Sequence, residues 1–174
     1  EKRITNLDFS NESASMISFI KQNAPNLSYL MITGGEPFID TAHIEALEIL
    51  KPYSQNITLE YTSNLNTLTE KANEIFLYWE KYKSIRLKIS IDGDPPIYDQ
   101  IRVGGDHEAM EKNIKRIIDK FPLNDSPKAI KQKFVIFGTC TVSRYNISRL
   151  HFIANYITKL GCLFLASHVD TPDF

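Results

Sequence analysis

The chain has 174 residues, enough for one domain with a hydrophobic core, and its 43% hydrophobic and 24% charged residues are typical of a globular protein. Its net charge of −1 gives no electrostatic reason to expect nucleic acid or an anionic membrane as the main partner. No apolar run approaches the roughly 20 residues that span a bilayer, and no secretory signal pattern is present, so we expect no membrane association and no export.

The two cysteines indicate a compartment. Cys140 and Cys162 both fall within apolar, strand-like runs. Buried, reduced thiols are the expected state of such residues, and this is typical of a cytoplasmic protein. A disulfide between them requires that their strands are neighbours.

The N-terminal part of the chain is predicted to begin with a helix. Residues 1–10 are interpreted as a polar leading segment. Asn11 or Ser13 is the expected cap of the helix that follows, and Pro25-Asn26 ends it.

From there the chain alternates strand and helix. Strands are predicted from apolar, β-branched and aromatic runs at residues 27–32, 57–62, 85–91, 134–142 and 163–165. Helices are predicted from apolar stripes within residues 44–50, 68–79, 110–121 and 150–160. Regular alternation at this spacing predicts βαβ units and one parallel sheet. Because the series opens on a helix, we expect that a first strand is missing.

The turn after the first predicted strand has the chemistry of a cation site. Gly34 and Gly35 let the backbone turn sharply and approach a ligand, and Pro37 stiffens the bend. Glu36 adds a carboxylate beside exposed backbone carbonyls. The turn therefore favours a ligand with a cationic head such as an ammonium, although an ordinary strand-to-helix turn is the alternative.

Polar clusters follow four successive predicted strands. They are Gly34-Gly35-Glu36, Thr62-Ser63-Asn64, Ser90 with Asp92, and Thr141 with Ser143. The carboxyl ends of parallel strands meet at one edge of a sheet, which is where ligands bind in such folds. The sequence therefore predicts a binding site at this edge.

The order of these pieces resembles the radical S-adenosylmethionine (radical SAM) superfamily, most closely the branch that often carries SPASM or twitch auxiliary cluster domains. The pieces are Gly34-Gly35-Glu36-Pro37, Tyr61-Thr62-Ser63-Asn64-Leu65, Ser90-Ile91-Asp92-Gly93, Ile101-Arg102, Glu111-Lys112-Asn113-Ile114, and Thr141-Val142-Ser143 with Asn146. The resemblance covers nearly the whole chain.

The resemblance implies an α/β fold that forms a partial (β/α)6, TIM-like barrel. Residues 1–174 would be strands two to six of this core, truncated at both ends, with residues 171–174 stopping where auxiliary domains begin. The implied cofactors are S-adenosylmethionine and a 4Fe–4S cluster, which together yield a 5′-deoxyadenosyl radical that abstracts hydrogen from a peptide or small metabolite. An electron donor such as flavodoxin or ferredoxin is the implied partner.

The resemblance also implies roles for individual residues. The candidate cofactor residues are Gly34, Gly35, Glu36 and Pro37 for the methionyl ammonium, Ser90 and Asp92 for the ribose, Arg102 for the methionyl carboxylate, and Ser63 and Asn64 for cofactor or substrate. The competing interpretations are an Asx turn for Asp92 and a solvated surface position for Arg102. No catalytic residue is assigned.

The chain departs from the family at the cluster. Family members bind it with Cys-x3-Cys-x2-Cys after the first strand, and this chain has no such motif. Cys140 and Cys162 cannot supply three thiolates. The histidines show no metal-ligand spacing; they are His43, His107, His151 and His168. We therefore predict no metal ligands in this chain, and no activity from it alone.

Two other functions are considered. The missing cysteines are also typical of a non-catalytic remnant or interaction module of the same fold. An unrelated α/β barrel enzyme that binds phosphate at Gly104-Gly105 is the third hypothesis, but Asp106 and Glu108 make the local charge unfavourable for an anion.

Overall fold

The computed structural model of the protein describes residues 2–7, 13–39, 42–122 and 133–168. The predicted cap Asn11 and residues 171–174 lie outside these ranges. The strands are β1 Lys2–Leu7, β2 Leu27–Ile32, β3 Thr58–Ser63, β4 Ser84–Ser90, β5 Phe134–Val142 and β6 Leu163–His168. The α-helices are α1 Ser13–Asn23, α2 Ala42–Leu50, α3 Ala72–Trp79, α4 Pro95–Ile101, α5 His107–Lys120 and α6 Leu150–Lys159. Short 3₁₀ helices are η1 Ala24–Asn26, η2 Lys51–Asn56 and η4 Ile147–Arg149.

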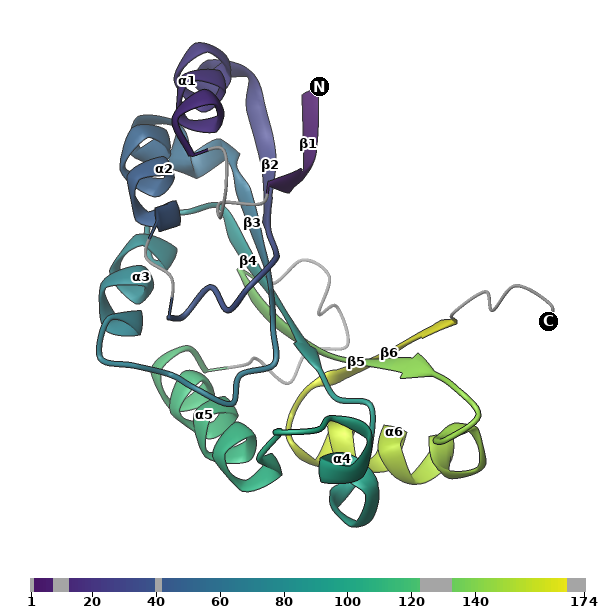
Figure 1. Ribbon diagram of the computed structural model, residues 1–174. Helices are drawn as coiled ribbons and strands as arrows, with labels where there is room; N and C mark the ends of the chain where they lie inside the picture. The colour runs from purple at the N-terminus through teal and green to yellow at the C-terminus, as the bar shows by residue number, and fades with distance from the viewer. Residues whose placement is uncertain (1, 8–12, 40–41, 123–132, 169–174) are drawn as a thin grey trace, which may run out of the picture.

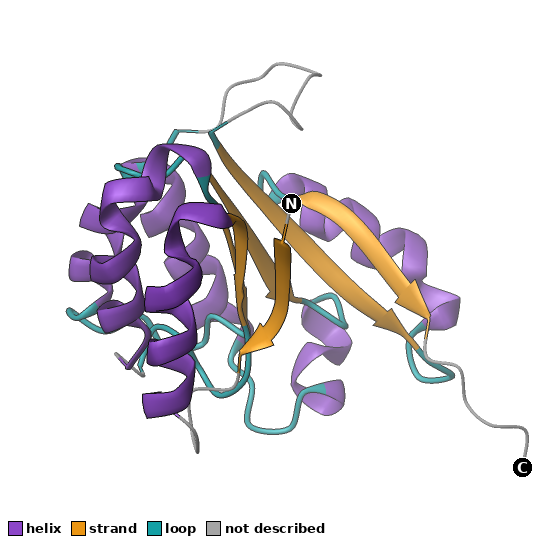
Figure 2. Cartoon of the chain, turned by 90° about the horizontal axis from the view of Figure 1, so that it is seen from above, coloured by secondary structure: helices purple, strands orange, loops and turns teal. Residues whose placement is uncertain are grey.

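The six strands form one parallel sheet in the order β1-β2-β3-β4-β5-β6. Each connection moves one strand further in the same direction, and right-handed crossovers of this kind place their helices on the same face of the sheet. In Figure 1, α1, α2 and α3 follow one another beside β2, β3 and β4, and Figure 2 shows the helices around the strands from above. The predicted parallel α/β sheet is confirmed.

The first strand of the sheet, β1, was not predicted from the sequence. Residues 1–10 were expected to be a polar leading segment and the sheet was expected to lack its first strand, but β1 pairs with β2 in parallel, with Lys2 opposite Leu27 and Leu7 opposite Ile32. The prediction was wrong because Ile4 and Leu7 are three residues apart and do not alternate as strand residues usually do. The register between β1 and β2 shifts twice, so irregular backbone pairing holds β1 at the edge of the sheet.

The other elements lie close to their predicted positions, with one omission. The predicted strand at residues 134–142 is β5 itself, and the strands predicted at 57–62 and 85–91 each differ from β3 and β4 by one residue. Sequence reasoning missed α4, because Pro95 and Pro96 were interpreted as part of a turn. Both prolines lie in the first turn of α4, where a missing backbone N–H costs no hydrogen bond.

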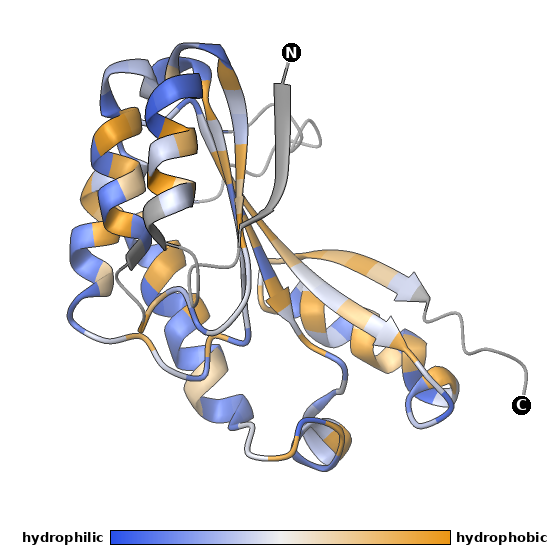
Figure 3. Ribbon diagram, turned by 45° about the horizontal axis from the view of Figure 1, so that its top comes forward, coloured by the Kyte–Doolittle hydropathy of each residue, from blue (hydrophilic) through white to orange (hydrophobic). Residues whose placement is uncertain are grey.

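The side of the sheet that faces the helices is apolar. In β4, Ile85, Leu87 and Ile89 are each 2% exposed or less and alternate with partly exposed polar residues. The centre of this core is aromatic: the ring of Trp79 lies 5.9 Å from that of Phe38, and further rings surround it. The helices carry hydrophobic and hydrophilic residues on different sides (Figure 3), as amphipathic helices do.

The opposite side of the sheet is polar at its centre. Lys88 Nζ lies 2.7 Å from Glu60 Oε1, and the hydroxyl groups of Thr58 and Ser84 are 2.8 Å apart. Arg86 lies directly opposite Glu60 in the strand register. The Glu60 side chain is only 3% exposed, although the strand order places it on the face away from the connecting helices.

Gly138 in β5 is required by the packing of α6. A Cβ atom at this position would lie 2.5 Å from Cγ2 of Ile157, closer than real Cβ contacts allow. Ile157 is completely buried in α6, and a β-branched side chain in a helix has little rotamer freedom with which to move away. The contact therefore sets the distance between α6 and the sheet.

We expect Gly138→Ala to lower the free energy of unfolding by about 1–3 kcal/mol, because it overpacks this contact. Ile157→Ala alone should cost about 2–5 kcal/mol through the cavity that it leaves. The double variant should lose clearly less than the sum of the two, since truncation of Ile157 makes room for the new methyl group. Urea unfolding of the four proteins measures this coupling, and strict additivity would contradict the proposed clash.

Candidate functional site

The exits of β2, β3, β4 and β5 lie along one edge of the sheet, because these neighbouring strands are parallel. The four predicted polar clusters therefore share one rim. What the individual side chains do at this rim depends on the contacts that each of them makes.

The Gly34-Gly35 turn after β2 has the predicted backbone geometry. Gly34 has φ +89° and Gly35 has φ +53°, which is the left-handed region that favours glycine. The two residues are exposed, whereas Pro37 and Phe38 are buried beside them. Phe38 stacks on Tyr61 with ring centroids 5.9 Å apart. The glycine turn is thus followed directly by Phe38, whose side chain packs into the aromatic core.

The carboxylate of Glu36 joins the exits of β2 and β3. Its Oε1 accepts a hydrogen bond from Ser63 Oγ at 2.6 Å, and its Oε2 accepts one from the backbone N–H of Asn64 at 3.2 Å. The N–H of Phe38 donates to Oε1 at 3.4 Å. Ser63 and Asn64, predicted to face cofactor or substrate, therefore hold Glu36 in position.

Burial raises the pKa of Glu36 above its ordinary value, and the hydrogen bonds from Ser63 and the backbone oppose this only in part. Two carboxylate oxygens offer about four lone pairs, so the three donors leave acceptor capacity for a ligand. Among the residues whose side chains are described (15–39, 43–122 and 133–167), no lysine or arginine forms an ion pair with Glu36. The site can therefore accept a hydrogen-bonding cation.

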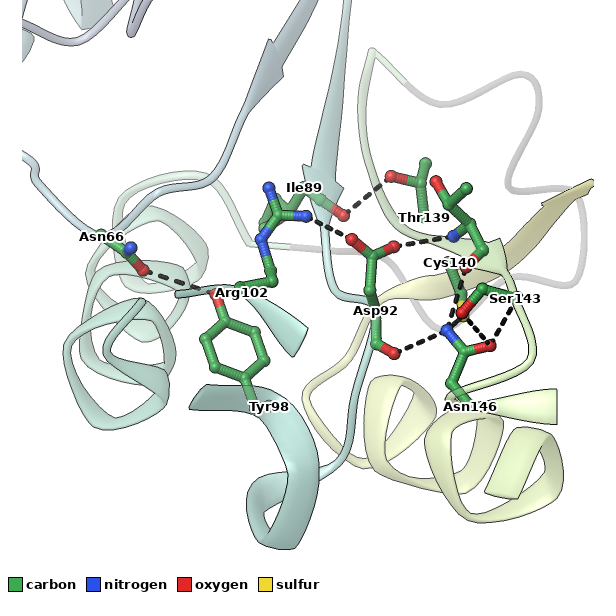
Figure 4. A network of polar contacts seen from close by, with 10 residues as sticks. Asn66, Ile89, Asp92, Tyr98, Arg102, Thr139, Cys140, Ser143 and Asn146 are labelled. Carbon is green, nitrogen blue, oxygen red and sulfur yellow. Dashed lines mark hydrogen bonds and ion pairs between the residues drawn. The ribbon is translucent and has the colours of Figure 1, made fainter. Parts of the chain in front are cut away.

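Asp92 and Arg102, predicted to contact different parts of one cofactor, contact each other (Figure 4). Arg102 Nη1 donates to Asp92 Oδ2 at 2.5 Å, and the backbone N–H of Thr141 donates to Asp92 Oδ1 at 2.7 Å. The side chains are 14% exposed for Asp92 and 25% exposed for Arg102. Arg102 is thus fixed at the rim by an ion pair and is not a freely solvated residue.

Asn146 connects the exits of β4 and β5 and is completely buried. Its Nδ2 donates to the backbone carbonyls of Asp92 and Thr141, both at 2.9 Å, and its Oδ1 accepts from the N–H of Ser143 at 2.8 Å (Figure 4). From the sequence, Asn146 was identified only as part of a family motif. Its position three residues after Ser143, in a polar turn, was the signal for this role.

Asp94 forms an ion pair with a different arginine, Arg149. Arg149 Nε donates to Asp94 Oδ1 at 2.9 Å, and Arg149 Nη2 donates to Asp94 Oδ2. This guanidinium lowers the pKa of Asp94 below its ordinary value. Asp92 and Asp94 therefore do not form a carboxylate pair, because each contacts a different arginine.

The loop after β3 reaches towards α4 and α5, a connection that sequence reasoning missed. Leu65 adopts a positive φ of 55°. Asn66 Oδ1 accepts a hydrogen bond from Tyr98 Oη at 3.4 Å (Figure 4), and Asn113 Nδ2 donates to the carbonyl of Leu65 at 2.9 Å. Polar contacts thus continue along the rim from the β3 exit to α4 and α5.

Ser90 and the Gly104-Gly105 pair complete the predicted residues. Ser90 is half-buried at the end of β4. A Cβ atom at Gly105 would lie 2.8 Å from the carbonyl oxygen of Arg102, so tight packing explains this glycine. Asp106 caps α5 by accepting from the N–H of Ala109 at 2.9 Å. A carboxylate at this helix start disfavours phosphate binding there.

Both cysteines are buried and free, as predicted. Burial raises the pKa of the Cys140 thiol to about 11 and that of Cys162 to about 12, so neither is a ready thiolate. No group of three or more potential metal ligands occurs in the described ranges. The residues present here do not fit a 4Fe–4S cluster.

No family model matches the chain, and no curated protein matches it. Within the described residues, no helix is long and apolar enough to cross a membrane. The radical SAM resemblance therefore rests on the residue motifs alone.

We expect Asn146→Ala to lower the free energy of unfolding by about 1–3 kcal/mol, because it leaves buried backbone groups at the β4 and β5 exits without their partner. Asn155→Ala, an exposed change in α6, is the matched control and should stay within about 0.5 kcal/mol of the wild type. Urea denaturation measures both variants. Equal effects of the two changes would show that Asn146 does not join these strand exits.

Proposed function

We propose that this chain is the S-adenosylmethionine-binding core of a radical SAM enzyme. The observation that carries the proposal is the Glu36 carboxylate, which Ser63 and Asn64 hold at the end of β2, on the same rim as the Asp92–Arg102 pair at the end of β4. A partly buried acceptor and a cation on one rim complement a ligand that carries both an ammonium and a carboxylate.

The residues present fit the cofactor as follows. Glu36 and the backbone carbonyls of the Gly34-Gly35 turn would accept hydrogen bonds from the methionyl ammonium. Asp92 and Ser90 would contact the ribose hydroxyl groups. The guanidinium of Arg102 has five N–H donors and gives one to Asp92, so donors remain for the methionyl carboxylate.

A partial (β/α)6 barrel is the architecture that we propose for the sheet. Its sequential strand order supports this, because each connecting helix then lies on the outer side. The polar centre formed by Glu60, Lys88 and Arg86 supports it too. Parallel sheets covered on both faces are usually apolar on both, whereas a concave face that lines a ligand cavity is polar.

The 4Fe–4S cluster of the family does not fit the residues of this chain, because the three cysteines of the family follow the first strand and residues 8–12, which follow β1, contain no cysteine. Its ligands would have to come from other polypeptide. In radical SAM enzymes the bound cofactor supplies a 5′-deoxyadenosyl radical for hydrogen abstraction. The contribution of this chain would be to bind S-adenosylmethionine, to orient its sulfonium and to exclude water. The proposed substrate is a peptide or small metabolite, and the proposed electron donor is a flavodoxin or ferredoxin.

The absence of fitting cluster ligands favours a second candidate, a non-catalytic module of the same fold. Polypeptide outside residues 1–174 that carries Cys-x3-Cys-x2-Cys would support the enzyme. Its absence from the complete protein would support the module.

Binding of S-adenosylmethionine to the 174-residue chain tests the proposal. By isothermal titration calorimetry, Glu36→Gln should weaken binding about tenfold or more, because it removes a charged acceptor of the ammonium. Glu74→Gln, an exposed change in α3, is the control for loss of charge and should have no effect.

A second ligand separates this role from damage to the fold. 5′-Methylthioadenosine lacks the methionyl ammonium and carboxylate, so Glu36→Gln should leave its affinity unchanged. Equal weakening of both ligands, or no binding of S-adenosylmethionine to the wild type, would reject the proposal.

The affinity for S-adenosylmethionine should also depend on pH through Glu36. Burial raises the pKa of this carboxyl group above its ordinary value. Protonation as the pH falls through the raised pKa removes the negative charge, so affinity should decline at acidic pH. Calorimetry from neutral to acidic pH should show this decline in the wild type. The Glu36→Gln variant should lack it, and an identical pH profile would assign the dependence to another group.

A further inference from the structure

A pocket lies at the opposite edge of the sheet from the candidate site. It has a volume of about 240 Å³ and opens beside Ile85 and Phe134, at the amino ends of β4 and β5. Its position follows from strand direction, because Asp92 leaves the carboxyl end of the same strand, β4. We call it the Trp79 pocket. Its walls include Trp79, Phe121, Phe134, Lys120, Lys133 and Glu80.

Aromatic rings form the floor and sides of the Trp79 pocket. Phe121 and Phe134 have ring centroids 5.1 Å apart and planes inclined by 32°. Trp79 lies 5.7 Å from Phe121 and 5.6 Å from Phe134, and it is 1% exposed. Aromatic faces arranged in this way favour a planar apolar ligand.

The mouth of the pocket is cationic. Lys120 Nζ lies 6.0 Å from the ring centroid of Phe121, and no ion pair of Lys120 occurs among the described residues. Lys133 Nζ donates to the backbone carbonyl of Glu80 at 2.6 Å, and this hydrogen bond fixes the ammonium group of Lys133 at the mouth of the pocket. Among the described lining residues, two ammonium groups stand against the single carboxylate of Glu80.

We propose that the Trp79 pocket binds a small planar aromatic anion, such as an aromatic carboxylate. The rings of Phe121, Phe134 and Trp79 contact its apolar body, and Lys120 and Lys133 pair with its acidic group. The pocket is slightly smaller than the roughly 300–1,000 Å³ typical of sites for drug-sized ligands, which limits the ligand to one or two fused rings. The inference uses none of the residues proposed to bind S-adenosylmethionine.

The test uses the single tryptophan of the chain. Because Trp79 is the only source of an indole N–H signal, its peak in a ¹H–¹⁵N correlation spectrum reports directly on the pocket. Addition of 2-naphthoate to the 174-residue chain should shift this peak saturably. 2-Naphthamide has the same rings without the charge and should bind about two- to fivefold more weakly.

Charge variants give the matched control. Lys120→Gln and Lys133→Gln should each weaken 2-naphthoate binding about two- to fivefold and leave 2-naphthamide unchanged. Lys71→Gln removes the same charge from an exposed position outside the pocket and should change neither affinity.

Two outcomes overturn the inference. Equal affinities for the acid and the amide would show an apolar pocket without preference for anions. An unresponsive Trp79 peak would show that the ligand does not enter the pocket. Neither result bears on S-adenosylmethionine binding, which depends on Glu36.

Discussion

The hydrogen bonds that Glu36 receives from Ser63 and Asn64 fix the geometry on which the candidate site depends. They join the exits of two adjacent parallel strands, and Asn146 joins the next two exits in a comparable way. A half-buried carboxylate without hydrogen-bond donors would destabilise the folded protein. These donors orient it while acceptor capacity remains, so the contacts that stabilise the rim also leave the carboxylate able to accept a further hydrogen bond.

The distribution of charge separates the two faces of the sheet. On the helix side, apolar alternation in β4 packs against the helices. On the other side, Glu60 and Lys88 pair at 2.7 Å although Glu60 is almost inaccessible. A buried ion pair does not stabilise a fold more than apolar residues of the same size would, because desolvation opposes the attraction. Its presence at the sheet centre is therefore not explained by stability.

Much of the fold could be predicted from the sequence, because buried parallel strands such as β5 are continuous apolar runs and helices such as α5 carry an apolar stripe. β1 could not, since its pairing with β2 does not depend on alternation in its own sequence. α4 was missed because prolines are compatible both with turns and with a first helical turn. For the site, the sequence indicated which residues lie at the rim. It could not indicate that Arg102 pairs with Asp92, because that contact depends on α4, the unpredicted helix that lies between the two residues.

The same aromatic core supports both ends of the sheet. Phe38, which follows the Gly34-Gly35 turn, has its ring 5.9 Å from that of Trp79, and Trp79 in turn forms the floor of the pocket at the other end. Protein interiors are close-packed, so substitutions of Trp79 would disturb both regions at once and could not assign a function to either. The functional assignments have to come from the polar residues at each end, for which different ligands are proposed.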